Sequence, residues 1–172
     1  MATPHKLSHV VLQTNRLPEM RDWYCRLLGA HPVFENELLA FLAYDDEHHR
    51  IGLLAVERYG ERPGPVVGLQ HFSFTYDSLD TLLEHYEGLK KDGVLPVWTV
   101  DHGPTISFYY ADPEANWIEL QVDVFKTNEE VNAFMEGEIY HSNPIGVVFD
   151  PDDLAARYRA GEPLESLTTR RG

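Results

Sequence analysis

"LSHVVLQTNRLPEMRDWYCRLLGAHPV" (residues 7–33) can be laid over "LQHFSFTYDSLDTLLEHYEGLKKDGVLPV" (residues 69–97), with His9 aligned to His71 at an offset of 62 residues. Farther along, "FLAYDDEHHRIGL" aligns with "FYYADPEANWIEL" at an offset of 67, which pairs Phe41 with Phe108 and Ile51 with Ile118. Self-similarity over such a length indicates two copies of one structural unit.

Each copy is predicted to form a strand, a helix and then three strands. In the first copy, Pro18 suits the opening turn of a helix and Gly29 its end. In the second, Asp77 or Ser78 can cap a helix that stops at Gly93. Strands are expected at residues 7–14, 38–45, 50–57, 94–100, 105–111 and 116–123.

The chain is expected to be a single domain spanning residues 1–172. Module one would cover residues 6–58, a linker rich in Gly and Pro residues 59–67, and module two residues 68–125. A tail follows at residues 126–172.

Two signals predict short helices in this tail. Thr127 to Glu130 has the form of a capping box, and Pro151 can open a helix that Gly161 closes. The segment "SNPIGVVFDP" (residues 142–151) could fold over whatever the two copies build, and its apolar residues favour docking over a disordered acidic tail.

Composition excludes several classes of protein. The 172 residues carry a net charge of −14, which argues against nucleic acid or a membrane surface as partner, because both attract clustered Lys and Arg. No apolar run is long enough to cross a membrane, and the N-terminus lacks the pattern of a signal peptide. Cys25 is the only cysteine, so internal disulfides are excluded and a cytoplasmic location is expected.

Alternation along three strands places two histidines and a glutamate among small or polar residues. His9 shares a strand face with Val11 and Gln13, His71 shares one with Ser73 and Thr75, and Glu119 shares one with Gln121 and Asp123. The opposite faces are apolar. A buried imidazole is costly unless something bonds to it, so the pattern predicts a lined cavity.

The alignment sets Glu119 opposite Gly52, so the first copy offers no matching carboxylate. A lone histidine on such a strand is more often a hydrogen-bonded core residue, and a lone glutamate is more often ion-paired. Recurrence of histidine in both copies favours a metal site instead. Two imidazoles and one carboxylate are the facial triad of non-haem Fe(II) enzymes, whereas four protein ligands would favour a lyase or isomerase.

At these residues the chain resembles the vicinal oxygen chelate superfamily, and within it a single-domain type I extradiol dioxygenase. The resemblance implies an α+β fold in which two repeated βαβββ modules form an open, metal-holding, β-barrel-like sheet with a short C-terminal helical tail. The family's iron ligands match His9 in "LSHVVL", His71 in "LQHFSF" and Glu119 in "ADPEANWIEL".

The resemblance also implies three catalytic residues. They are His49, the second histidine of "EHHRIGLLA", His102 in "VDHGPT" and Tyr109 in "ISFYYADP". Without the resemblance, His49 would be interpreted as an exposed turn residue, His102 as a loop residue and Tyr109 as part of the core.

The activity implied by the resemblance is extradiol cleavage of a catechol similar to 2,3-dihydroxybiphenyl, with Fe(II) as cofactor, Mn(II) as the less favoured metal and O2 as co-substrate. Folds of this kind usually associate, so a homo-oligomer is expected. Two alternatives remain open: a metal-dependent lyase or isomerase of the glyoxalase type, and a drug-binding resistance protein without catalytic activity.

Overall fold

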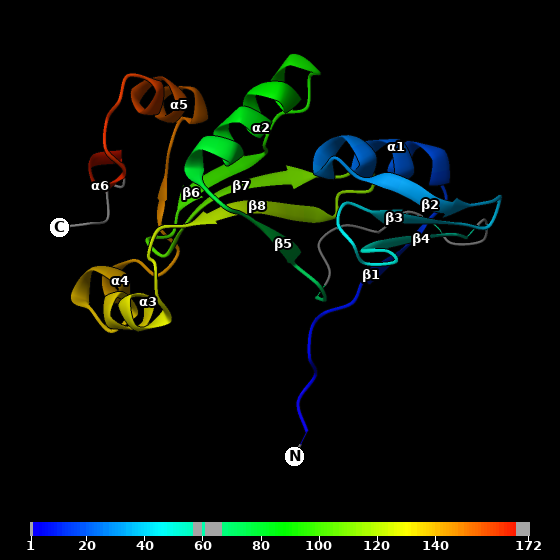
Figure 1. Ribbon diagram of the computed structural model, residues 1–172, viewed down its shortest axis with the longest axis horizontal. Coiled ribbons are helices and arrows are strands. Elements are labelled where there is room, and N and C mark those ends of the chain that lie inside the picture. Colours follow the sequence, from blue (N-terminus) through cyan, green and yellow to red (C-terminus); the bar gives the residue numbers. More distant parts are fainter. Residues whose placement is uncertain (1, 57–59, 61–66, 168–172) are drawn as a thin grey trace. The chain divides into compact units, whose positions relative to one another are not determined.

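The computed structural model describes residues 2–56, 60 and 67–167, which divide into two compact units (Figure 1). The first unit contains the described residues up to Gly68 together with residues 112–116, and the second contains Leu69–Ala111 and the described residues from Trp117 onward. Of the predicted linker, only Gly60 and Val67 lie within the described residues. The module boundaries set out above stay a prediction.

The first unit is a four-stranded sheet with one helix across it (Figure 1). The helix α1 begins next to Pro18 and ends at Gly29, whose φ of 63° is the left-handed cap that favours glycine, as predicted. Its inner face buries Met20, Tyr24 and Leu27 completely. The elements are β1 (Val10–Thr14), α1 (Leu17–Leu28), β2 (His31–Glu35), β3 (Leu39–Ala43) and β4 (Ile51–Ala55), in the sheet order β1-β4-β3-β2.

The second unit repeats this plan. Ser78 caps α2, accepting a hydrogen bond from the backbone of Thr81 in a capping box, and the apolar face of α2 is buried. The elements are β5 (His71–Tyr76), α2 (Leu79–Lys91), β6 (Trp98–Asp101), β7 (Thr105–Ala111) and β8 (Trp117–Asp123), in the sheet order β5-β8-β7-β6 followed by a tail strand, β9. The predicted βαβββ repeat is therefore confirmed.

The outer pairs of strands confirm the two offsets of the alignment. In the first unit β1 runs parallel to β4 with Val11 opposite Gly52, and in the second β5 runs parallel to β8 with Ser73 opposite Glu119. The position of the missing carboxylate in the first repeat is therefore Gly52, as expected.

The inner strands correct the alignment by one residue. Phe41 lies opposite Gly52, and Tyr109 lies opposite Glu119, so Phe41 corresponds to Tyr109 and its pairing with Phe108 was wrong. The hairpins differ in length: residues 43–50 lie between the paired Leu42 and Ile51, whereas residues 111–117 lie between the equivalent pair, Tyr110 and Ile118. The extra residue shifts the register.

Two strands begin later than predicted. The strand expected from residue 94 starts at Trp98, because Pro96 has no N–H to give to a sheet. The strand expected from residue 7 starts at Val10, since the Arg50 guanidinium occupies the carbonyls of Leu7 and Ser8 at 2.9 and 3.1 Å. His9 therefore lies just before β1 and is exposed, so its expected burial was wrong.

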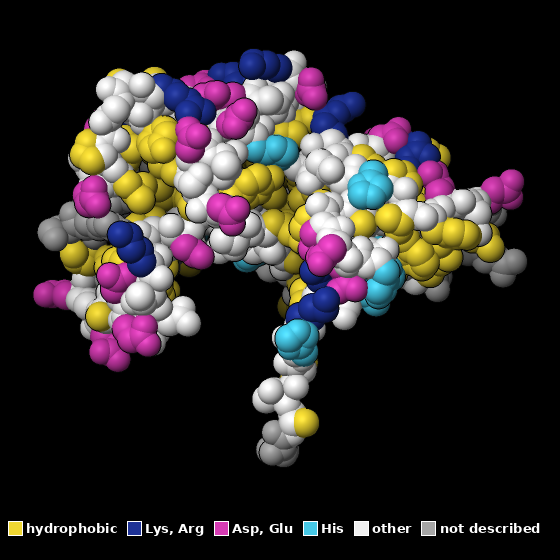
Figure 2. Space-filling model, in the orientation of Figure 1, with side chains coloured by type: hydrophobic (Ala, Val, Ile, Leu, Met, Phe, Trp, Pro, Cys, Tyr) yellow, Lys and Arg dark blue, Asp and Glu magenta, His cyan; other side chains and the backbone are white. Residues whose placement is uncertain are grey.

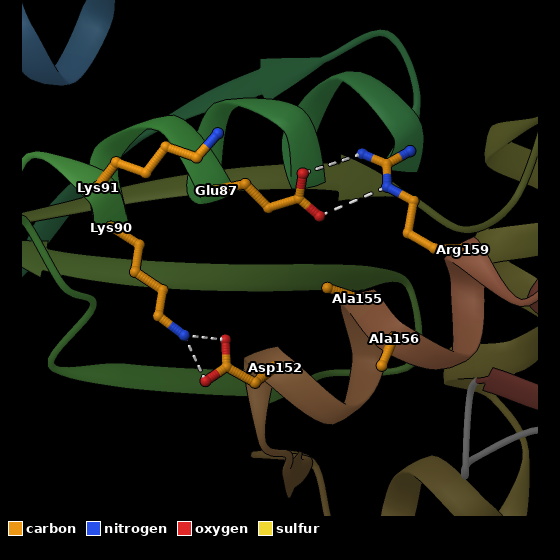
Figure 3. A pocket seen from close by; sticks show the side chains of 7 residues that line it. All are labelled: Glu87, Lys90, Lys91, Asp152, Ala155, Ala156 and Arg159. Atoms are coloured by element: carbon orange, nitrogen blue, oxygen red, sulfur yellow. Dashed lines mark hydrogen bonds and ion pairs between the residues drawn. The ribbon is translucent and has the colours of Figure 1, made fainter.

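The tail docks on the second unit. Ion pairs join its helix α5 to α2, with Lys90 Nζ 2.5 Å from Asp152 and Arg159 Nε 3.4 Å from Glu87 (Figure 3). Both predicted helix starts are confirmed, at Thr127 and at Pro151. The tail elements are α3 (Asn128–Met135), α4 (Glu138–Ser142), β9 (Val147–Val148), α5 (Pro151–Arg159) and α6 (Leu164–Leu167).

On the face drawn in Figure 2, Lys and Arg lie interspersed with Asp and Glu, with hydrophobic side chains showing between them. Within the described ranges, no helix combines the length and the apolar character that crossing a membrane requires.

Candidate active site

Glu119 is the centre of a polar cluster in the second unit. It lies in the middle of β8, between β5 and β7, and only 4% of its surface is exposed. The Tyr109 hydroxyl donates to Oε1 at 2.9 Å, and Nε2 of His71 lies 3.1 Å from Oε2. A buried carboxylate is costly unless it is bonded, so these two partners stabilise Glu119 in place.

Tyr109 links this carboxylate to His102, which follows the end of β6. The Nε2 atom of His102 lies 2.9 Å from the Tyr109 hydroxyl oxygen. Burial raises the pKa of Tyr109, and the charge of Glu119 and the hydrogen bond to it raise it further. Tyr109 is therefore a phenol at neutral pH and keeps its hydroxyl proton.

Aromatic rings surround the cluster. The rings of Trp98 and Trp117 lie 4.9 and 5.9 Å from that of Tyr109, and the His71 ring meets Tyr109 edge-on at 5.3 Å. Such contacts hold a ring in one orientation. The Tyr109 hydroxyl is thus fixed by packing as well as by hydrogen bonds.

The first unit holds a histidine cluster. His49 is 8% exposed, and its ring stacks between those of His9 and Phe41, at 4.4 and 4.3 Å. Nδ1 of His48 lies 2.6 Å from Nδ1 of His49, so one of the two nitrogens donates to the other. An exposed turn histidine, the interpretation without the resemblance, is wrong for His49 because two neighbouring rings bury it.

Burial lowers the pKa of His49, and the nearby His9 and His48 lower it further. The neutral imidazole is therefore favoured, which is the form that can accept a proton.

The structure brings together four of the six predicted site residues in the second unit: His71, His102, Tyr109 and Glu119. It brings the other two, His9 and His49, together in the first unit. Over residues 2–56, 60 and 67–167, no three His, Cys, Asp or Glu side chains gather closely enough to hold a metal ion. A metal site that combines ligands from both repeats stays a prediction.

One partner of the cluster was missed by sequence reasoning. The main-chain carbonyl of Ile145 bonds to Nδ1 of His102. The segment "SNPIGVVFDP" was expected to fold over the two halves, but nothing in its side chains marks which backbone group would make the contact.

The sequence matches known proteins along nearly its whole length. Residues 6–120 match the family described as the Glyoxalase/Bleomycin resistance protein/Dioxygenase superfamily. The chain is 46% identical over 169 residues to biphenyl-2,3-diol 1,2-dioxygenase 2 of Rhodococcus globerulus, covering 98% of this chain and 88% of that protein. It is also 46% identical over 172 residues to biphenyl-2,3-diol 1,2-dioxygenase 3 of the same organism, covering 99% and 90%.

Solved structures share the fold at low identity. A glyoxylase/bleomycin resistance protein/dioxygenase domain from Frankia sp. EAN1pec superposes with a TM-score of 0.59 at 19% identity, over 75% of this chain and 99% of that one. A lactoylglutathione lyase from Agrobacterium tumefaciens superposes with a TM-score of 0.56 at 20% identity, over 70% of this chain and 96% of that one. By its sequence, the chain belongs to the Glyoxalase/Bleomycin resistance protein/Dioxygenase superfamily.

Proposed function

We propose that this protein is an extradiol dioxygenase that uses Fe(II) and O2 to open the ring of a catechol of the 2,3-dihydroxybiphenyl kind. Two relatives at 46% identity carry the name of that activity. The observation that carries the proposal is the bonded series His102, Tyr109, Glu119 and His71, in which a buried carboxylate faces an imidazole nitrogen at 3.1 Å.

These donors suit the proposed metal. Nε2 of His71 and Oε2 of Glu119 face one another, and imidazole with carboxylate is the donor set of non-haem iron sites. We assign His9 as the third ligand and keep Mn(II) as the less favoured metal. Bound iron would acidify the diol and hold it next to O2. Because the ligands come from both repeats, the proposal requires the two repeats to act as one domain.

The other residues would orient the substrate and move protons. Tyr109, a phenol with a fixed hydroxyl, would donate a hydrogen bond to a substrate oxygen. His102, bonded to that hydroxyl, would orient it. His49, favoured in its neutral form, would accept a proton from the substrate and return it during ring opening.

The first test is direct. The protein is loaded with Fe(II) without air and mixed with a panel of catechols that includes 2,3-dihydroxybiphenyl. The expected result is a yellow ring-fission product with oxygen uptake. Iron binding with no turnover across the panel would support the lyase or isomerase alternative, against which Gly52 counts, since it supplies no fourth ligand. Failure to bind any metal would support a binding protein.

The second test separates the role of His49 from metal binding. His49→Ala should keep the metal and lose most turnover, because the proposed proton acceptor is removed. His31→Ala, an exposed histidine of the same unit, is the matched control and should keep full activity. Full activity in His49→Ala would contradict the assignment.

Two further expectations stay predictions: a cytoplasmic location, supported by the single cysteine, and a homo-oligomeric state.

A further inference from the structure

The orientation of the His102 ring depends on the C-terminal tail. The backbone of this residue is held by its own hairpin, with its N–H donating to the Thr105 carbonyl at 3.0 Å and the Gly103 N–H donating to Asp101 Oδ1 at 2.8 Å. These bonds fix the backbone and do not themselves orient the ring. Its Nδ1 atom bonds to the main-chain carbonyl of Ile145, and its Nε2 atom lies 2.9 Å from the Tyr109 hydroxyl.

A carbonyl oxygen only accepts hydrogen bonds, so Nδ1 of His102 must carry a proton to bond with Ile145. In the neutral ring, Nε2 is then an acceptor, so Nε2 and Glu119 Oε1 are two acceptors for the single proton of the Tyr109 hydroxyl. The opposite tautomer would place two lone pairs against one another at the Ile145 carbonyl. The tail therefore selects the tautomer in which the His102 lone pair, together with Glu119 Oε1, competes for the Tyr109 hydroxyl proton.

A tight turn in the tail brings this carbonyl into place. Asn143 closes the turn with two hydrogen bonds to Gly146, at 2.7 and 3.1 Å. The next two residues form β9, which pairs with Val100 and Asp101 at the end of β6.

Gly146 is required for so close an approach. Its φ is 115°, which L side chains rarely adopt, and a Cβ atom there would lie 2.3 Å from the Asp101 carbonyl oxygen and 2.7 Å from a methyl group of Val100. Any other residue would push the turn away from β6 and withdraw the carbonyl that precedes it.

We propose that the turn at residues 143–146 is a positioning element for His102, acting through the Ile145 carbonyl, and that Gly146 is its positioning residue. The inference rests on the proposed function, because that function gives the aligned His102 ring its role in orienting the substrate. The tautomer selected by the turn can nevertheless be measured without turnover.

The test uses Gly146→Ala in the full-length chain. Nitrogen-15 spectra of the histidine rings in the metal-free protein should show His102 changing from the Nδ1-protonated form to a mixture of tautomers. In the iron-loaded protein, kcat for 2,3-dihydroxybiphenyl should fall about tenfold to a hundredfold through misalignment. Iron affinity should be unchanged.

Gly161→Ala is the matched control, because Gly161 also has positive φ in the tail, at 88°, but its Cβ would meet nothing within 4 Å. The control should leave both the His102 spectrum and kcat unchanged. Asn143→Ala is the second variant, since it loosens the same turn without adding an atom near β6. Asn143→Ala should shift the tautomer of His102 in the same direction, and it provides the test even where Gly146→Ala does not fold.

A double-mutant cycle tests whether the turn acts through His102. In a His102→Ala background, Gly146→Ala should cause no further loss of kcat. An equal loss in both backgrounds, or an unchanged His102 spectrum in both turn variants, would overturn the inference. A shifted tautomer in a chain that cleaves no catechol would instead leave the positioning intact and refute the proposed function.

Discussion

The two βαβββ repeats share a strand order and a parallel register. They differ at three equivalent positions, which are apolar or glycine in the first repeat (11, 41 and 52) and polar in the second (73, 109 and 119). The first repeat places Val11 and Phe41 on either side of Gly52, and a Cβ at that glycine would lie 3.2 Å from Val11 and 3.6 Å from Phe41. The hydrocarbon side chains of these two neighbours occupy the space beside Gly52.

In the second repeat the sizes are exchanged. The small Ser73 and the hydroxyl-bearing Tyr109 lie on either side of Glu119. The comparison teaches that a carboxylate in the middle of a sheet needs changes at both neighbouring strands: one must become small and the other must offer a hydrogen bond. Replacing Gly52 alone could not make the repeats equivalent.

The largest effect is expected from Glu119→Gln, which removes the charge that distinguishes the second repeat while keeping the side chain's size. Iron affinity and ring cleavage should each fall at least about a hundredfold, since even residues that only support a ligand can cost that much. The fold should persist. Metal content and oxygen uptake are the measurements, and Asp123→Asn, at the exposed end of the same strand, is the control. Retained iron binding would remove Glu119 from the ligand set.

The helix tyrosines offer a second comparison, because Tyr24 and Tyr86 are separated by the repeat offset. Tyr24 donates to Asp112 at 3.0 Å, and Asp112 is 4% exposed, whereas Tyr86 donates at 2.7 Å to Asp152, whose side chain is 60% exposed. Tyr24→Phe should lower the free energy of unfolding by about 1.5–3 kcal/mol, because a buried carboxylate loses a donor. Tyr86→Phe should cost less, since water can replace the hydroxyl.

The effect of Tyr24→Phe should also depend on pH. Burial raises the pKa of Asp112 above its usual value of 3.8, and loss of the Tyr24 donor would raise it further. The deficit of the variant should therefore grow as pH rises through the pKa of the folded protein and shrink on acidification. Denaturant titrations at several pH values measure it. A loss of unfolding free energy that grows as the pH falls would contradict this prediction.

The N-caps of α1 and α2 are expected to differ less in their contribution to the free energy of unfolding. Ser78→Ala should lower the free energy of unfolding by about 1 kcal/mol, because the capping box with Thr81 is lost. Arg16→Ala at the start of α1 should have no measurable effect, since the Arg16 side chain makes no capping hydrogen bond. Equal losses in urea denaturation would show that the caps do not distinguish the repeats.

The smallest effect is expected at Gly52. Gly52→Ala should change stability by less than about 0.5 kcal/mol, because the gain of about 0.5–1 kcal/mol from replacing glycine in a strand is offset by crowding against Val11. In a Val11→Ala background the same change should become stabilising. A denaturation cycle over the two sites measures this coupling. No coupling would mean that Val11, which is 52% exposed, moves aside without cost.

Sequence reasoning reached the fold because its signals are local. The ends of the helices follow from Pro18, Gly29 and Ser78, whose backbone or capping chemistry acts within one turn. The candidate residues of the second repeat were also found, because alternation sets His71 and Glu119 on polar strand faces. The registers of β1–β4 and β5–β8 agree with the alignment to the residue.

Other features escaped because they depend on loop lengths and on distant neighbours. One extra residue in the first hairpin aligns Phe41 with Tyr109, and no pattern within either strand marks that shift. The burial of His49 depends on the rings of His9, just before β1, and Phe41, in β3.

By itself the sequence determined the repeated βαβββ plan, the helix ends and the glutamate that only the second repeat carries, since these depend on periodicity and on residues with special backbone chemistry. Only the tertiary structure decided that the Tyr109 hydroxyl bridges His102 and Glu119, and that the Ile145 carbonyl bonds to the His102 ring. The reason is physical: every residue carries a main-chain carbonyl, so the one that bonds to His102 is known only once the chain is folded.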